Sequence, residues 1–520
     1  MKETRRDFLK KSGCCALGMA SLATQMHHLG TMSAMAQKVI DAQPAGGDSY
    51  KALVLLYWDG GNDTNNMIIP MHNDSTVSGY DLYNAERGAS TLGLTQAQLQ
   101  NTQITIPRVS SLAYGMHPAL GPAATGAINN GIHELYGMGK LAIVANVGTL
   151  VRPLTRAQYQ SSTYQKPYQI GSHSDQKAQH QTSISNTQAF TGWGGRLSDR
   201  LTGLHNPTGL VPMITSIAGA QLFTAGQSTL PMAIASANNT GAPNLSSVLN
   251  PAGYGTAPTG ANLARLNAFN ALRSQDLASN YIEAASHVTD LAMQANASLQ
   301  TSQEVTVPFP NTSVGLQLKQ VARLIKKRLD LNVNRQIFYV QIGGFDTHTN
   351  QLAGQQNLYS QFSQAMRAFY DEMVAQGVSN DVVTFTLSEF GRTFNPAGSG
   401  AAVGSDHGWG SHMFVMGGSV SGGNLYGSLR PDGTGNYFPN LITGNSVGAT
   451  DDADSGANGR GRWIPTTSVE MYALRLARWF GLEEADEASV FPNYWSAGQG
   501  GIDHRNHDAA NAQLDFLPWP

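Results

Sequence analysis

DVVTFTLSEFGRTFNPAGSGAAVGSDHGWGSHMFVMGG, residues 381–418, combines two buried-strand patterns with a polar segment between them. Residues 382–387 are β-branched, aromatic or uncharged and predict a strand buried on both faces, and residues 413–416 predict a second. Because open α/β sheets bind their ligands at the carboxyl ends of strands, we expect a functional site here. The alternative is a polar loop whose groups only cap or pair locally. The groups in question are Glu389, Arg392, Asp406, His407 and His412.

The rest of the chain repeats the alternation of apolar runs and amphipathic segments. Buried strands are expected at residues 51–57, 141–147 and 335–342, with two short ones between 211 and 236. Helices are expected at residues 121–139, 261–299, 316–329 and 351–376. This order predicts an α/β fold with a doubly wound, mainly parallel sheet sandwiched by helices. Loop and helical insertions complete it, the largest at about residues 237–310.

Polar side chains follow two more of these strands. GGFDTHTNQ after the strand at 335–342 places Asp346 and His348 two residues apart. WDGGNDTNNMIIP after the first strand offers Asp59 and Asp63, which suit a metal or an oxyanion, or else only an Asx-rich turn. A long polar loop before residue 176 adds a Ser172–His173 pair, which is a weak signal because sequence neighbours seldom face each other.

The first 36 residues predict an export signal rather than part of the fold. TRRDFLKK contains the arginine pair Arg5–Arg6, a weakly apolar run follows, and AMA at residues 34–36 is a cleavage site of small residues. This pattern predicts export by the twin-arginine translocase and a periplasmic or secreted location. Residues 37–49 are then a linker.

Composition excludes several classes of protein. With 41% hydrophobic and 13% charged residues, the chain has the balance of a globular protein. Removal of the leader takes away five basic and two acidic residues and leaves a net charge of −6, and we find no basic stripe typical of nucleic-acid binding. Both cysteines, Cys14 and Cys15, lie in the leader, so thiolate chemistry is excluded from the mature chain. No later segment is apolar enough over 18 residues to span a membrane.

The motifs together resemble the bacterial domain of unknown function 1501 family in order and spacing. They are LYWDGGNDTNNMIIP, GMHPAL, GKLAIVANVG, GSHSDQ, GWGGRL, GGFDTHTNQ, LSEFGRTFN, SDHGWGSHMFVMGG and RWIPTTSVEMYALRLARWFGL. The resemblance covers residues 50–482 and leaves 483–520 as an extension packed on the domain. It implies an alkaline-phosphatase-like fold, from the superfamily that includes the sulfatases and carries divalent metals at strand ends.

The same resemblance implies a set of metal ligands. Asp346 and His348 resemble the superfamily's Asp/His pair, and Asp406–His407 resembles its Asp-His-Gly pair. Asp63 matches the family motif better than Asp59, although either could be the first-strand ligand. Carboxylates with imidazoles and no thiolate favour Zn, Mn or a similar ion. The implied ligands are Asp63, Asp346, His348, Glu389, Asp406, His407 and His412.

Catalytic groups are less well defined. The sulfatase motif Cys-x-Pro-x-Arg is absent. Ser172, with His173 beside it, and Thr64 are the candidate nucleophiles, and Arg392 is a candidate donor to a substrate's oxygens or else a salt-bridge partner of Glu389. Two functions remain open: a metal-dependent hydrolase of phosphate or sulfate esters, acting on a small anionic ester or glycan, and a non-catalytic phosphatase-like binding or envelope-assembly protein.

Overall fold

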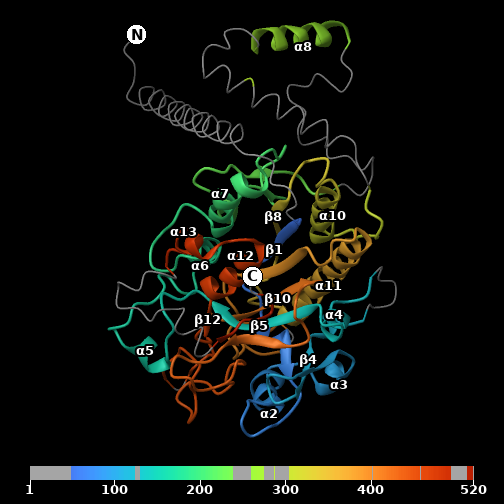
Figure 1. Ribbon diagram of the computed structural model, residues 1–520. Coiled ribbons are helices and arrows are strands. Elements are labelled where there is room, and N and C mark those ends of the chain that lie inside the picture. Colours follow the sequence, from blue (N-terminus) through green and yellow to red (C-terminus); the bar gives the residue numbers. More distant parts are fainter. Residues whose placement is uncertain are drawn as a thin grey trace, which may run out of the picture.

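The fold is built on one large mixed sheet, seen in the computed structural model of Figure 1. The structure describes residues 49–122, 129–237, 259–273, 286, 304–400, 402–456, 458–493 and 512–518. In spatial order the sheet contains β13 (Ala512–Gln513), β11 (Leu425–Ser428), β5 (Leu141–Gly148), β10 (Ser411–Gly417), β9 (Val382–Ser388), β1 (Lys51–Asp59), β8 (Arg335–Gly343), β6 (Ile214–Ser216) and β7 (Met232–Ala233). β12 (Thr467–Ser468) also pairs with β5.

Most neighbouring strands in this sheet are parallel. β1 lies between β8 and β9 and is parallel to both, and β11 and β12 are parallel to β5. β10 is antiparallel to β9 and to β5. The carboxyl ends of β1, β5, β8 and β9 therefore share one edge with the amino end of β10, and every loop that leaves or enters at this edge meets the others there.

The remaining elements are short strands and helices. A separate three-stranded sheet contains β2 (Ile68–Pro70), β4 (Leu112–Met116) and β3 (Gln103–Ile106). The α-helices are α2 (Tyr80–Tyr83), α3 (Gln96–Leu99), α4 (His133–Gly137), α5 (Arg156–Gln160), α6 (His173–Thr182), α7 (Trp193–His205), α8 (Gly260–Arg273), α10 (Ser313–Lys326), α11 (Gln351–Ala375), α12 (Val469–Phe480) and α13 (Glu487–Val490).

Helices cover both faces of the large sheet. Figure 1 shows α6, α7, α12 and α13 on one side and α10 and α11 on the other. The strand alternation explains this, because successive side chains point to opposite faces. Trp58 of β1 packs on Phe362 of α11, with ring centroids 5.2 Å apart. Phe385 of β9 faces the other way and packs on Trp193 of α7. The expected doubly wound, mainly parallel α/β fold is confirmed.

Two expectations about individual elements are wrong. Residues 121–139 do not form one long helix: among the described residues of that stretch, the only α-helix is His133–Gly137. Glycine explains part of this, since a Cβ at Gly131 would lie 1.9 Å from the Gly121 carbonyl oxygen. The polar loop before residue 176 instead leads into a helix, α6, whose polarity hid it from a search for apolar periodicity.

Some of the expected segments fall outside the described residues. These are the leader, nearly all of the linker, most of the insertion at 237–310 and part of the C-terminal extension. Where the extension is described, α13 lies against α7 and β13 pairs with β11. In the described part of the chain, no helix combines the length and apolarity that crossing a membrane requires.

Candidate metal centre

Four side chains meet at the shared edge of the sheet. His173 is the first residue of α6, Asp346 and His348 follow β8, and His407 lies between β9 and β10. The His407 Nε2 atom is 3.0 Å from His173 Nε2 and 3.1 Å from His348 Nε2. Asp346 Oδ1 is 3.0 Å from His348 Nε2 and 3.3 Å from His407 Nε2. One ligand atom each from His173, Asp346 and His407 lies within 4.8 Å of the others.

The other nitrogen of each imidazole faces an acceptor outside the cluster. His407 Nδ1 is 2.7 Å from the Gly171 carbonyl oxygen, and His173 Nδ1 is 2.9 Å from Glu389 Oε1. His348 Nδ1 is 3.4 Å from Asp406 Oδ1. These acceptors favour a proton on each Nδ1, so the Nε2 lone pairs point at one another and at Asp346. Such lone pairs repel unless a proton or a cation lies among them.

The electrostatics of the three best-defined groups differ. Hydrogen bonding to Glu389, aided by the charges of Glu389 and Asp346, raises the pKa of His173. Burial lowers the pKa of His407, which keeps its lone pair free at neutral pH. For Asp346, burial acts to raise the pKa, but the hydrogen bond and charge of Arg392 prevail and lower it. An ionised carboxylate beside a neutral imidazole is a donor set suited to a divalent metal.

Buried groups beneath the cluster fix these side chains. The Glu389 side chain is 1% exposed, and its Oε1 also accepts a 2.8 Å hydrogen bond from the Gly60 N–H. Gly60 has φ of +120°, and a Cβ there would lie 2.3 Å from the Asp346 backbone nitrogen. The glycine therefore lets the ends of β1 and β8 approach closely enough to set Asp346 beside His173.

Arg392 contributes to this support and does not pair with Glu389. Its Nη1 donates to Asp346 Oδ1 at 2.8 Å and to the Gly60 carbonyl at 3.4 Å, and its Nη2 donates to the Ser405 carbonyl. The side chain is fully buried. A guanidinium with these contacts holds Asp346 in place, so the structure does not present Arg392 to a substrate.

Two of the expected ligands lie elsewhere, and their assignment to the cluster is wrong. Asp63 is buried and receives two hydrogen bonds from Arg87, at 2.6 and 3.0 Å, and one from Gln351. His412 is also buried, and its Nδ1 accepts a 3.0 Å hydrogen bond from the Asn146 N–H. Burial lowers the pKa of His412 to about 3. Both side chains satisfy interior groups.

Two further expected ligands support the histidines from outside the cluster. Glu389 contacts the outer nitrogen of His173, and Asp406 that of His348. Asp406 Oδ2 also accepts a 2.5 Å bond from Arg460. Carboxylates in these positions commonly orient the histidine ligands of metals.

The expected Ser172–His173 pair takes two separate roles. The Ser172 Oγ donates to Asp175 Oδ2 at 2.6 Å, while His173 reaches the cluster. The other candidate hydroxyl, Thr64 Oγ1, accepts from the His412 N–H. The sequence signal for the position of His173 was Ser172-x-x-Asp175, a spacing typical of a helix start. This spacing indicates a helix that begins at His173, and the structure shows that start, although the Ser172 side chain makes no capping hydrogen bond.

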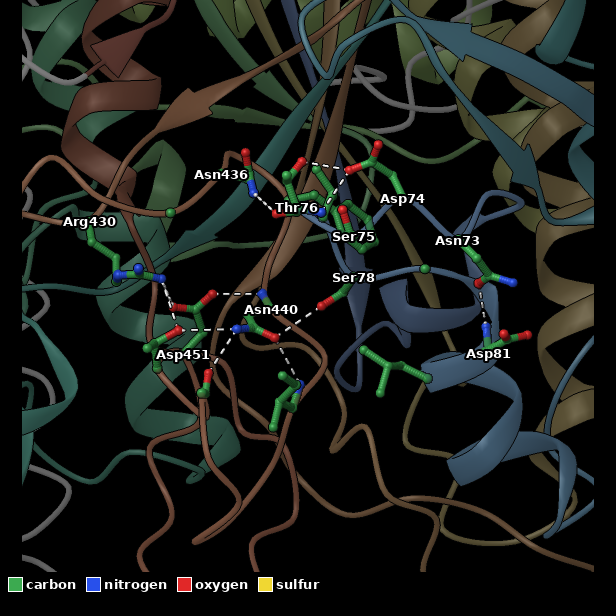
Figure 2. A pocket seen from close by; sticks show the side chains of 18 residues that line it. Asn73, Asp74, Ser75, Thr76, Ser78, Asp81, Arg430, Asn436, Asn440 and Asp451 are labelled. Carbon is green, nitrogen blue, oxygen red and sulfur yellow. Dashed lines mark hydrogen bonds and ion pairs between the residues drawn. The ribbon is translucent and has the colours of Figure 1, made fainter.

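The pocket in Figure 2 is separate from the metal centre. It has a volume of about 490 Å³ and lies between residues 73–82 and 430–451, and no cluster residue lines it. Its polar groups pair with one another: Ser78 donates to Asn440 at 3.0 Å, and Arg430 to Asp451 at 2.8 Å. These bonds tie the two loops together.

Comparison with known proteins identifies a family. The family described as "Protein of unknown function (DUF1501)" has a sequence model that matches residues 50–437. A search of curated proteins finds no match to the sequence.

Among solved structures, similar chains include Ps i-CgsB in complex with k-i-k-neocarrahexaose, with 9% identity and a TM-score of 0.28 over 88% of this chain and 75% of that one. The PsFucS1 sulfatase from Pseudoalteromonas sp. has 10% identity and a TM-score of 0.26, covering 76% and 68%. A mutant of alkaline phosphatase PafA has 11% identity and a TM-score of 0.21, covering 68% and 64%.

Proposed function

We propose that this chain, which belongs to the DUF1501 family, is a metal-dependent hydrolase of phosphate or sulfate esters. The observation that carries the proposal is the convergence of three imidazole Nε2 atoms on the Asp346 carboxylate. The spacings of His407 and Asp346 from each other and from the remaining histidines, 3.0 to 3.4 Å, agree with about 3.3 Å for neighbouring ligands held 2.0–2.1 Å from a tetrahedral ion. A shared proton satisfies two lone pairs only, whereas a divalent ion satisfies the whole set.

The residues of the chain have distinct roles in this proposal. His173, Asp346 and His407, whose ligand atoms lie within 4.8 Å of one another, would hold the ion, with His348 beside them. When bound there, a divalent ion such as Zn or Mn supplies positive charge to the oxygens of the transferred phosphoryl or sulfuryl group. Arg392 fixes the position of Asp346, which replaces its expected role as a donor to the substrate.

The openness of the site supports access by a substrate. Of the four side chains, Asp346 is 46% and His348 45% exposed, while the supporting Glu389 is buried. Three protein ligands would leave one coordination position of the ion open, as in metal sites that act on substrates, whereas structural sites are closed. We also propose that the twin-arginine translocase exports the chain to the periplasm. There it would meet a small anionic ester or a glycan.

Metal loading and ester hydrolysis test the function together. Protein stripped with a chelator and reloaded with Zn or Mn should contain stoichiometric metal by elemental analysis and should hydrolyse 4-nitrophenyl phosphate or 4-nitrophenyl sulfate. Ser172→Ala should leave turnover within about threefold, because the hydroxyl is engaged by Asp175. Metal content far below stoichiometry under every loading condition would refute the proposal.

One observation favours the alternative of a phosphatase-like binding or envelope-assembly protein. Among the described residues, no serine or threonine hydroxyl forms a hydrogen bond with His173, Asp346, His348 or His407. Many hydrolases use such a hydroxyl as their nucleophile. Stoichiometric metal binding without hydrolysis of either nitrophenyl ester would decide for this alternative.

A further inference from the structure

One wall of the metal centre carries cations that are only partly used by other protein groups. Arg460 reaches the centre through Asp406, to which its Nη1 donates at 2.5 Å. Its side chain is 50% exposed, and in the described part of the chain Asp406 is the one carboxylate paired with it. A guanidinium has five N–H donors, so most of those of Arg460 remain available to a ligand at the mouth of the site.

A second cation approaches the same segment from another loop. The Lys166 ammonium lies 5.1 Å from the centre of the Tyr159 ring, and Tyr159 packs on Trp409, with centroids 5.2 Å apart. Trp409 follows His407 by two residues, and the loop of Lys166 continues to Gly171, whose carbonyl holds His407. Within the described residues no carboxylate forms an ion pair with Lys166.

The backbones that carry these two cations are held in place. Arg156, the first residue of the helix α5 that leads into the loop of Lys166, donates to the carbonyls of Gly444, Ala449 and Asp454. The Arg460 N–H donates to Asp454 Oδ2 at 3.1 Å. The segments that carry Lys166 and Arg460 are therefore tied to each other through residues 444–454.

We propose that Arg460 and Lys166 form an accessory anion-binding rim, and that the substrate is an ester on a polyanion. This inference rests on the proposed function: one phosphate or sulfate group occupies the metal centre while a neighbouring anionic group binds the rim. Arg460 is the stronger member, because a guanidinium fork binds phosphate or sulfate oxygens through charge-assisted hydrogen bonds. Lys166 acts as a point charge.

Binding and turnover of two kinds of probe test the rim. The single-anion probes are 4-nitrophenyl phosphate and 4-nitrophenyl sulfate, and the polyanions are inositol hexakisphosphate and sucrose octasulfate. Affinity is measured by calorimetry on metal-loaded protein, and turnover by release of nitrophenol, phosphate or sulfate. Arg460→Ala should weaken polyanion binding by about tenfold and lower the polyanion to single-anion ratio of kcat/KM by a similar factor. Arg460→Lys should retain part of the polyanion affinity and part of the kcat/KM preference. Lys166→Ala should weaken polyanion binding by about threefold.

Arg200→Ala is the matched control. Arg200 is 49% exposed and lies on α7, where it contacts Asp486 and Ser489 instead of the centre. Equal changes of polyanion affinity in Arg460→Ala and Arg200→Ala would overturn the rim. Nitrophenyl ester turnover with no preference for polyanions would overturn the rim and leave the function standing. Arg460-dependent polyanion binding without any turnover would overturn the proposed hydrolase function and leave the rim standing.

Discussion

Glu470 gives the stability of this protein a pH dependence that one substitution should remove. It is the second residue of α12 and is fully buried, and burial raises its pKa from 4.5 to about 8 despite opposing contributions from Ser468 and Arg196. The folded state therefore keeps a proton that the unfolded state releases. Stability is fully present below pH 4.5 and falls as the pH rises toward 8. At about 1.4 kcal/mol per pH unit, the loss is about 3 kcal/mol at pH 7 and about 5 kcal/mol above pH 8.

Glu470→Gln keeps the shape of the side chain and removes the titration. The free energy of unfolding, measured by urea denaturation with tryptophan fluorescence at pH 5, 6, 7 and 8, should fall with pH in the wild type more steeply than in the variant. The free energy of unfolding of the wild type minus that of the variant should fall by about 3 to 4 kcal/mol from pH 5 to pH 8. Glu483→Gln, an exposed change just beyond the same helix, is the control. A difference in the free energy of unfolding between the wild type and Glu470→Gln that stays constant over this pH range would refute the reasoning.

Three further predictions concern the centre and export. His407→Ala should lose metal and ester hydrolysis together, whereas His412→Ala should keep its metal because His412 lies outside the cluster; elemental analysis and 4-nitrophenyl ester assays distinguish them. Gly60→Ala should cut hydrolysis at least about tenfold, since its Cβ would meet the Asp346 backbone at 2.3 Å, and turnover at the wild-type rate would contradict this. Changing Arg5 and Arg6 to lysine should abolish export, as measured by the periplasmic yield after fractionation, and an unchanged yield would show that the leader is of another kind.

Sequence reasoning anticipated which side chains lie close together where it relied on strand ends. Parallel strands bring their carboxyl ends to one edge, and this rule alone placed Asp346 and His348 beside the segment that holds His407. The core strands were equally predictable from the sequence, because buried β-branched runs have few other conformations open to them.

The rule failed where the direction of a side chain mattered more than its position. Asp63 and His412 are both at the correct edge, yet both side chains turn inward to pair with Arg87 and with the Asn146 N–H. Those partners lie far along the chain or on another strand, so no local pattern reveals them. His173 was expected as a catalytic group beside Ser172, and its place in the cluster was missed because it belongs to a polar helix between strands and not to a strand end.

The central place of β1 has a consequence for how the chain folds during synthesis. β1 is the first strand made, but Lys51 pairs with Arg335 and Ala52 with Val382, so both neighbours are made only after nearly 300 further residues. At roughly 5–20 residues per second, β1 waits about 15 to 60 s for its first partner. During that time an apolar strand with two open edges is prone to aggregate, and its nonlocal pairing makes folding slow. A chaperone that holds β1 until β8 emerges should therefore raise the yield of folded protein.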